Sequence, residues 1–174
     1  MNIKLMPPDP NLAPLFFEWR QDSEAKKYNP MMTSTVEELR ERLSKAGSDF
    51  TQWDKFDAFF WFVNLDNNIV GNISLQNINK TMLTVEIGYA IAASSRSKGL
   101  ATAAVKLLTQ KVFALTPLRK LIAMVHEDNV ASQKLLEKIG YRQEGLLREH
   151  FLVNGEPANE IIYGILRRDF SLDH

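Results

Sequence analysis

The chain has 174 residues, of which 45% are hydrophobic and 24% charged, and this balance predicts one soluble domain that spans residues 1–174. The 21 Lys and Arg residues equal the 21 Asp and Glu residues, which argues against a nucleic acid as main partner because such proteins need a basic excess. The chain contains no cysteine, which excludes disulfides, cysteine-ligated metals and cysteine nucleophiles and suits a reducing cytoplasm.

The N-terminal third is predicted to hold one strand and two helices. Residues 3–6 read as a short strand that proline residues close. Apolar residues at helical spacing predict a first helix that begins near Asn11, and Thr35 with Glu38 forms a capping-box pattern for a second helix. Residues 48–55 are polar with aromatic residues and are predicted to be a loop that could lie over a cleft.

Three strands are predicted next. Residues 58–65 are rich in aromatic and β-branched side chains, and residues 69–75 return after the turn Asp66-Asn67-Asn68. A second polar turn at residues 77–80 leads into residues 82–91, so we expect an antiparallel meander.

The second half changes period. A helix is predicted from Lys98 to before Pro117, followed by a buried strand at residues 121–125. Another helix is expected after Asn129, with Gly140 as its C-terminal glycine. The apolar face of this last helix is predicted to consist of Ala131, Leu135 and Ile139.

The C-terminal segment contains a strong hairpin signal. Asn154-Gly155 separates two extended stretches, residues 141–153 and 160–166. Together with the preceding elements, this hairpin predicts a mixed α+β fold with helices packed on a sheet.

The loop before the predicted helix at Lys98 has the properties of an anion site. A helix start presents unpaired backbone N–H groups, Gly99 permits close approach of a ligand, and Arg96 and Lys98 add positive charge. The spacing is neither the nucleoside-triphosphate nor the dinucleotide glycine pattern. A pyrophosphate would fit the loop, although Gly99 could simply ease a turn between solvated charges.

The loop resembles the signature of the GNAT superfamily of N-acetyltransferases, which is Gln or Arg, two residues, Gly, one residue, then Gly or Ala, as in residues 96–101. Residues 85–89 resemble the family's fourth strand, and residues 129–141 resemble its second cofactor segment. Residues 149–155 resemble the branch that holds ribosomal-protein N-terminal and spermidine acetyltransferases. The resemblance implies a mostly antiparallel sheet with helices on both faces and a V-shaped splay between its fourth and fifth strands.

The resemblance also implies that acetyl-coenzyme A binds in this splay as a cosubstrate. Backbone groups of Tyr89, Ala90 and Ile91 would hold the pantetheine arm and the thioester, and Asn129 would bond to the arm. Lys138 would lie near the adenosine phosphates, or be solvated. No metal is expected, because the three histidines have no metal-binding spacing. The pyrophosphate is assigned to Arg96, Ser97, Lys98, Gly99, Leu100, Ala101 and Thr102.

Transfer to an amine requires a base and an acid. Glu86 is the leading candidate for the base, because it is a carboxylate on an otherwise apolar strand, although it could equally face solvent. Strand N–H groups near Ile91 could stabilise the tetrahedral intermediate. Many family members protonate the departing thiolate with a tyrosine at the position of Leu136. The resemblance to the ribosomal branch, in which certain members have a serine at this place after the asparagine, makes Ser132 the expected substitute, and Tyr141 is interpreted as a core residue.

The expected partners are acetyl-coenzyme A and an amine, either a protein N-terminus or a small amine such as a polyamine, antibiotic or metabolite. The alternative is a coenzyme A-binding module with little or no catalysis, which the missing tyrosine permits. No export signal or apolar run of eighteen residues is present, so we expect a cytoplasmic protein without a membrane partner. The apolar final strands permit a homodimer. The segments expected to face the acceptor contain five acidic residues, Asp22, Glu24, Asp54, Asp57 and Glu149. These residues would suit a cationic acceptor, but they could equally be ordinary surface charges.

Overall fold

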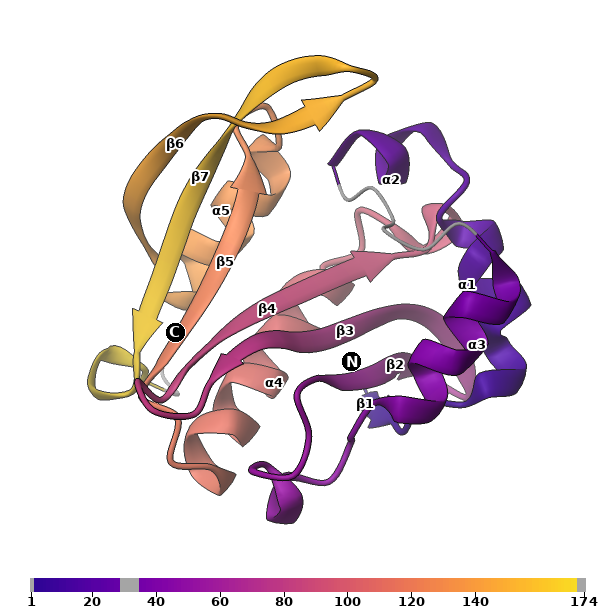
Figure 1. Ribbon diagram of the computed structural model, residues 1–174, viewed down its shortest axis with the longest axis horizontal. Coiled ribbons are helices and arrows are strands. Elements are labelled where there is room, and N and C mark those ends of the chain that lie inside the picture. The colour runs from indigo at the N-terminus through magenta and orange to yellow at the C-terminus, as the bar shows by residue number, and fades with distance from the viewer. Residues whose placement is uncertain (1, 29–34, 172–174) are drawn as a thin grey trace.

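A computed structural model describes residues 2–28 and 35–171 and places seven strands in one sheet with the order β1-β2-β3-β4-β5-β7-β6 (Figure 1). All pairings between these strands are antiparallel except β4 with β5. The strands are β1 (Ile3–Met6), β2 (Phe59–Leu65), β3 (Asn68–Asn79), β4 (Thr84–Ile91), β5 (Lys120–His126), β6 (Arg142–Val153) and β7 (Glu156–Leu166). The α-helices are α1 (Ala13–Trp19), α2 (Ser23–Tyr28), α3 (Val36–Lys45), α4 (Leu100–Leu115) and α5 (Val130–Ile139).

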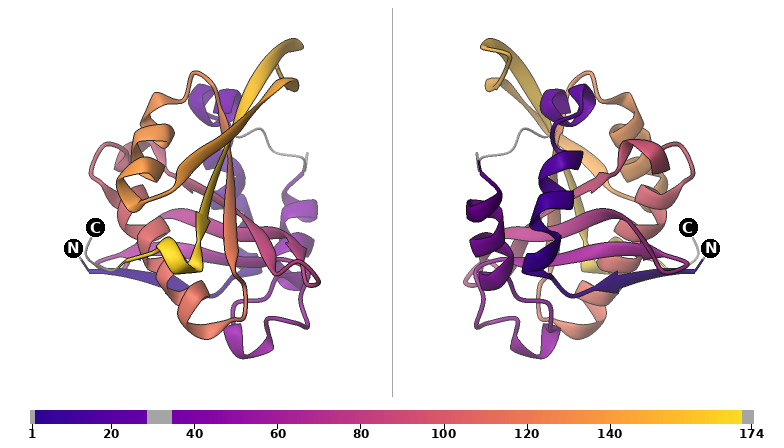
Figure 2. Two further views of the ribbon diagram at one scale, coloured as in Figure 1. Left: turned by 90° about the vertical axis from the view of Figure 1, so that its left-hand side faces the viewer. Right: turned by 90° about the vertical axis from the view of Figure 1, so that its right-hand side faces the viewer.

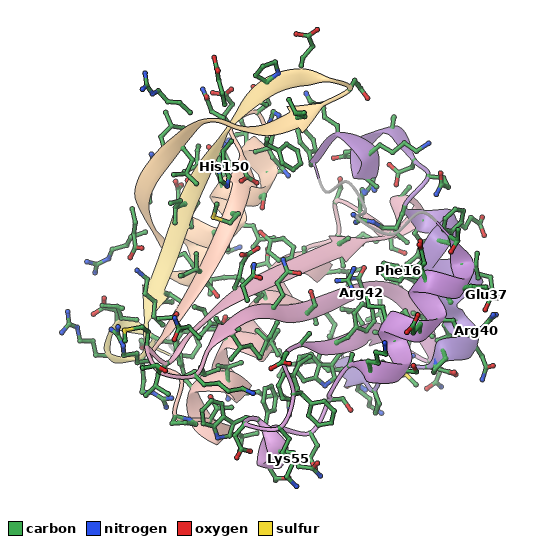
Figure 3. All side chains as sticks on the ribbon, viewed as in Figure 1. Phe16, Glu37, Arg40, Arg42, Lys55 and His150 are labelled. Atoms are coloured by element: carbon green, nitrogen blue, oxygen red, sulfur yellow. The ribbon has the colours of Figure 1, made fainter. Side chains whose placement is uncertain are left out.

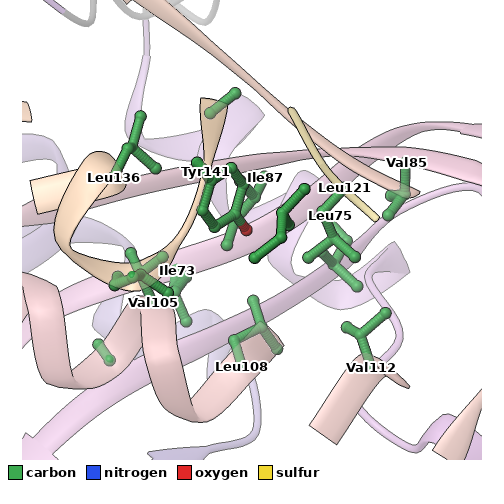
Figure 4. Close-up of a cluster of buried hydrophobic side chains, with 14 of the residues drawn as sticks. Ile73, Leu75, Val85, Ile87, Val105, Leu108, Val112, Leu121, Leu136 and Tyr141 are labelled. Carbon is green, nitrogen blue, oxygen red and sulfur yellow. The ribbon is translucent and has the colours of Figure 1, made fainter. Parts of the chain in front are cut away.

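Helices cover both faces of the sheet, as expected (Figure 2). The front face, toward the viewer in Figure 1, carries α1 and α3, and the back face carries α4 and α5. Phe60 and Phe62 of β2 point to the front and pack with Phe16 of α1. The larger core lies on the back face, where β2 to β5 and β7 pack against α4 and α5 (Figure 4).

The local sequence signals form the structures that they predict. Thr35 Oγ1 accepts the N–H of Glu38 at 3.1 Å, and Glu38 Oε2 accepts the N–H of Thr35 at 3.0 Å, which confirms the capping box. Gly140 ends α5 with φ of 103°. Asn154 and Gly155 turn the chain from β6 to β7 with φ of 53° and 86°. These positions need left-handed backbone, which glycine and asparagine adopt most readily.

The expected splay lies between β4 and β5. The two strands pair only where Thr84, Val85 and Glu86 face Lys120, Leu121 and Ile122. Beyond this seam β4 stays paired with β3 as far as Ile91, and β5 stays paired with β7 as far as His126. The strands therefore diverge (Figure 1), and the β4 edge from Ile87 to Ile91 has no pairing with β5.

The segment of residues 48–55, expected as a loop that could lie over a cleft, does not lie at the splay but contributes Lys55 to the lining of a cavity. It forms the 3-10 turn Phe50–Gln52, and Phe50 is buried. The ring of Phe50 lies 6.0 Å from that of Phe59 and 5.0 Å from that of Trp61, measured between centroids. Its aromatic side chain is buried in the back-face core, which fixes the segment there.

Two helices also differ from expectation. The apolar face of α5 is centred on Leu136 and Ile139, which are buried, whereas Ala131 is exposed. The short helix α2 was not predicted. It begins where Asp22 Oδ1 accepts the backbone N–H groups of Glu24 and Ala25 at 3.0 and 3.1 Å, an N-terminal signal that lies in the sequence but precedes only six helical residues.

Candidate active site

The loop between β4 and α4 presents an open set of backbone donors. Gly99 precedes α4 with φ of 73°, and a Cβ placed on it would meet nothing within 4 Å. The N–H of Ala103 bonds to Gly99 O, whereas the N–H groups of residues 100–102 bond to no described residue. These free donors lie at the positive end of a 16-residue helix. The loop therefore fits a phosphate group, which would accept these N–H groups.

The side chain of Arg96 is directed to α2 and the end of β4. Its Nε donates to Ile91 O at 3.1 Å, and its terminal nitrogens lie 2.8 Å from Asp22 Oδ2 and 2.6 Å from Glu24 Oε2. These bonds raise the pKa of Arg96 and lower the pKa of Asp22. Arg96 can therefore reach an anion in the loop only through its backbone, and it already neutralises two carboxylates that could have suited a cationic acceptor.

Of the other residues expected to contact the cosubstrate, those of β4 and Asn129 lie at the splay, and Lys138 lies at the far end of α5. Tyr89, Ala90 and Ile91 form the end of β4, beyond its pairing with β5. Asn129 caps α5, because its Oδ1 accepts the N–H of Ser132 at 3.1 Å, and its Nδ2 donates to no described residue. Lys138 is exposed in the last turn of α5. The splay thus brings the β4 edge and the N-terminus of α5 close to one another.

A hydroxyl pair lies between β4 and α5. Tyr89 Oη and Ser132 Oγ are 2.5 Å apart, although 43 residues separate them in sequence. Burial raises the pKa of Tyr89 to about 12, so the phenol remains protonated at neutral pH. Sequence reasoning assigned Tyr89 only a backbone role. The alternation of side chains along β4 could have predicted that Tyr89 lies on the same face as Val85 and Ile87. It could not have predicted that Tyr89 lies beside Ser132.

Leu136, at the position of the family's usual tyrosine, and Tyr141, the other residue considered for the acid, lie in the core (Figure 4). Leu136 is fully buried. Tyr141 Oη is 2.9 Å from Thr109 Oγ1, and burial raises the pKa of this tyrosine well above its usual range. The interpretation of Tyr141 as a core residue is therefore confirmed.

Glu86 lies on the front face of β4 and is held by two side-chain amides. Gln76 Nε2 donates to its Oε1 at 2.9 Å, and Asn77 Nδ2 donates to its Oε2 at 2.8 Å. Each carboxylate oxygen keeps a further lone pair. Glu86 is therefore fixed in orientation beside the seam and can still accept a proton.

A second carboxylate faces Glu86 across the splay. Glu160 of β7 pairs in register with His126 of β5, and its Oε2 lies 3.9 Å from His150 Nε2. Burial raises the pKa of Glu160, the charge of Glu86 raises it further, and the two histidines lower it. His126 Nδ1 accepts the N–H of Asp128 at 3.0 Å, so any proton on this ring is at Nε2. His150 lies on the β6 side of the opening (Figure 3), and sequence reasoning did not identify Glu160.

A cavity of about 680 Å³ lies on the front face beside Glu86. Ser74 and Gln76 of β3 and Arg42 of α3 contribute to its lining, and Gln76 is the residue that bonds to Glu86. The candidate base therefore adjoins a space large enough for a small-molecule acceptor.

No helix within the described ranges combines the length and apolar character that a bilayer crossing requires. The same ranges contain no group of three or more His, Cys, Asp or Glu side chains arranged to hold a metal ion.

Similar proteins share the arrangement of this chain. Residues 2–142 match the acetyltransferase (GNAT) domain. The probable N-acetyltransferase YjcK of Bacillus subtilis (strain 168) is 30% identical over 136 residues, which cover 78% of this chain and 75% of that protein. The spermidine N(1)-acetyltransferase of Escherichia coli (strain K12) is 30% identical over 112 residues, which cover 64% of this chain and 60% of that enzyme.

A solved structure extends the similarity to the whole fold. The ribosomal L7/L12 alpha-N-protein acetyltransferase RimL, in complex with coenzyme A, superposes with a TM-score of 0.82 at 17% identity. The superposition covers 95% of this chain and 94% of that one.

Proposed function

We propose, from the premise that this chain belongs to the GNAT family of acetyl-coenzyme A-dependent N-acetyltransferases, that it acetylates a primary amine by direct attack in the opening between β4 and β5. The observation that carries the proposal is the β4 edge beyond its short seam with β5, which leads into the open amides of α4. An extended arm can pair with such an edge while its phosphates lie at the helix start.

Acetyl-coenzyme A would supply an acetyl group activated as a thioester. We assign the pantetheine arm to the backbone of Tyr89, Ala90 and Ile91 and to Asn129 Nδ2, which has no other described partner. Lys138 is assigned to the adenosine end. The pyrophosphate is assigned to backbone N–H groups of Arg96, Ser97, Lys98, Gly99, Leu100, Ala101 and Thr102.

Glu86 is the proposed general base. A primary amine with a pKa near 10 is about 0.1% neutral at pH 7, so attack on a thioester requires removal of a proton. The two amides that hold Glu86 fix the direction of its carboxylate. Glu86 would take the proton directly or through a water molecule.

Ser132 is the proposed acid for the departing thiolate, and Tyr89 is its positioning residue. Serine alone is a poor acid, but the 2.5 Å hydrogen bond to Tyr89 fixes the Ser132 hydroxyl beside the free end of β4. The chain has Leu136 at the position of the family's usual tyrosine, and the Tyr89–Ser132 pair would provide a hydroxyl group in its place. This arrangement favours turnover over the alternative of a binding module.

The acceptor is a protein N-terminus or a small amine, since the similar proteins include enzymes named for each class. A cytoplasmic location and a homodimer stay predictions.

Turnover tests the proposal. The purified protein is incubated with acetyl-coenzyme A and a pool of primary amines, and free thiol is measured over time. We expect thiol release above the hydrolysis background together with acetylated amine. Tight coenzyme A binding without thiol release from any amine would contradict catalysis and support the binding module.

A further inference from the structure

Acetylation removes two protons from the acceptor nitrogen. A primary ammonium group carries three protons, and the amide product keeps one of them. The first proton has to leave before the attack, because only a neutral amine has a free lone pair, and the second leaves after the new N–C bond has made the nitrogen cationic again. Glu86 is proposed for the first proton. The second proton requires an acceptor close to the thioester.

The strand register places Glu160 at the level of the thioester. The pairing of β4 with β5 ends at Glu86 and Ile122. Counted along the two parallel strands from this pair, His126 of β5 is level with Ala90 of β4, and His126 pairs with Glu160 of β7. Glu160 therefore lies on the β5–β7 wall of the splay, level with the residues assigned to the thioester (Figure 1), whereas Glu86 lies four residues, or about 13 Å, closer to the seam.

The same register places both carboxylates on one face of the sheet. Paired residues share a face, and so do residues that are two or four apart along a strand. Glu86 shares the front face with its partner on β5, and His126 lies four residues further along that strand, so Glu160 shares the front face too. The paired side chains of Met124 and Ile162 lie between the two carboxylates on this face and are half-buried. An apolar stretch of the splay thus has a carboxylate on either side.

The carboxylate of Glu160 has no hydrogen-bond donor among the described residues. Its side chain is 15% exposed, and the nearest cationic group, His150 Nε2, is 3.9 Å from Oε2, which is beyond hydrogen-bond distance. The ring of His126 lies 5.4 Å from that of Tyr28 and 6.2 Å from that of Phe151, measured between centroids. Carboxylates with so little exposure are normally paired, and the protonated nitrogen of an acceptor would provide a donor.

The surroundings of Glu160 make its carboxylate a stronger base than an exposed glutamate. Burial is the largest influence on the pKa of Glu160 and raises it, and the charge of Glu86 raises it too. His150 and His126 only partly offset this rise. A base with a raised pKa lies closer to the operating pH and takes a proton more effectively.

We propose that Glu160 is a second catalytic residue, which accepts the proton that leaves the acceptor nitrogen after the N–C bond has formed. This inference rests on the proposed acetyl transfer. Glu86 takes the first proton, the nitrogen attacks the thioester carbon, and Glu160 takes the second proton. The C–S bond then breaks, and Ser132 gives its proton to the thiolate. One of the two protons removed from nitrogen restores the Ser132 hydroxyl, and the other is released to solvent.

Amines of different basicity separate the two carboxylates. A primary alkylamine that the protein acetylates is compared with its 2,2-difluoro analogue, which is largely neutral at slightly alkaline pH and has no first proton to lose. The rate of acetyl transfer is measured in single turnovers, so that product release does not contribute. Glu160→Gln should lower this rate about 10- to 100-fold for both amines, whereas Glu86→Gln should lower it mainly for the basic amine.

Further variants separate catalysis from folding. Glu160→Asp keeps a carboxylate with a shorter reach and should retain part of the rate. Glu156→Gln is the matched control, because Glu156 is an exposed glutamate on the same strand, and its rate should equal that of the natural chain. The denaturation midpoint of Glu160→Gln should not fall, since the carboxylate receives no hydrogen bond from the described residues. Its Kd for acetyl-coenzyme A should also stay unchanged.

The outcomes distinguish this inference from acetyl transfer itself. If the natural chain transfers acetyl groups and Glu160→Gln does so equally fast, only the role of Glu160 is wrong. A loss confined to the basic amine in Glu160→Gln would show that Glu160 takes the first proton, and would also overturn the inference. If the natural chain releases no thiol with any primary amine, acetyl transfer and the role of Glu160 are both wrong.

Discussion

The two faces of the central strands treat polar groups in opposite ways. On the back face, Tyr141 and Thr109 are completely buried beside α4 and satisfy each other through one hydrogen bond. On the front face, the buried guanidinium of Arg20 and the buried Oδ1 of Asn72 form no hydrogen bond with any residue of the described ranges. The difference indicates that the back face is built for stability, whereas the front face keeps buried polar groups that the described residues do not satisfy.

A substitution that creates a cavity in the back-face core should lower the stability of the protein and leave its catalytic rate unchanged. Leu108 of α4 is completely buried, so Leu108→Ala should lower the free energy of unfolding by about 2–5 kcal/mol, measured by chemical denaturation. The kcat of the remaining folded protein should stay unchanged. Leu115→Ala on the same helix is the control, because Leu115 is 56% exposed. A loss of kcat with full stability in Leu108→Ala would break the division between the faces.

Removing the front-face base should have the opposite effect. Glu86→Gln should lower kcat about 100-fold and abolish the part of the pH–rate profile in which the rate rises as the carboxylate loses its proton. The free energy of unfolding should fall by only about 1 kcal/mol, because the single oxygen of the substituted amide can replace one of the two hydrogen bonds from Gln76 and Asn77. Glu18→Gln, at an exposed position of α1, serves as control. An unchanged pH–rate profile would refute the assignment of Glu86 as the base.

The hydroxyl pair of Tyr89 and Ser132 should sharpen the comparison between the faces. It lies on the back face of the sheet, yet we assign it to catalysis rather than to stability. Tyr89→Phe should lower kcat about tenfold and leave the KM for acetyl-coenzyme A unchanged, since Ser132 loses its fixed orientation. The variant should keep the wild-type pH–rate profile below about pH 11, because the pKa of Tyr89 is about 12 and its phenol stays protonated there.

Tyr163→Phe is the control for this prediction. It removes a hydroxyl that donates to Glu137 at 3.0 Å, away from Ser132, and should leave kcat unchanged. Equal losses of kcat in the two variants would mean that the Tyr89 hydroxyl has no special part.

The ion pairs of Arg96 should give the smallest effect. Arg96→Gln should lower the free energy of unfolding at pH 7 by about 1 kcal/mol, since the side chains of Arg96 and Asp22 are each about 27% exposed. Arg96 holds the pKa of Asp22 below its unfolded value, so this stabilisation is present above about pH 4 and is lost as the pH falls through the folded pKa.

Denaturation curves at neutral and acidic pH check this prediction. The difference between the natural chain and Arg96→Gln should shrink on acidification, whereas Arg168→Gln, at a side chain that is 83% exposed, should show little difference at either pH. A difference that persists after Asp22 is protonated would show that the ion pair is not its source.

The sequence allowed prediction of the features that depend on neighbouring residues. The capping box of Thr35 and Glu38, the final glycine of α5 and the turn at Asn154-Gly155 each lie within a few residues, and each has one favoured backbone conformation. The splay between β4 and β5 was predicted only through the resemblance of the sequence to the GNAT superfamily.

The side-chain contacts of the site could not be predicted in the same way. The bond from Tyr89 to Ser132 and the pairing of Arg96 with Asp22 span 43 and 74 residues, and both depend on how helices pack on the sheet. The direction of Arg42 depends on how α3 is rotated against β3. A pattern of residue types contains none of this information, so Arg96 was assigned to an anion that its side chain does not face.

The short seam between β4 and β5 has a consequence for the folding equilibrium. Only three residues of each strand pair there, so two halves of one sheet share few backbone hydrogen bonds across the seam. A ligand that bonds along the β4 edge acts as the missing strand, and its binding free energy adds to the cohesion of the native state. At a concentration of 100 times its Kd, this gain amounts to about 2.7 kcal/mol.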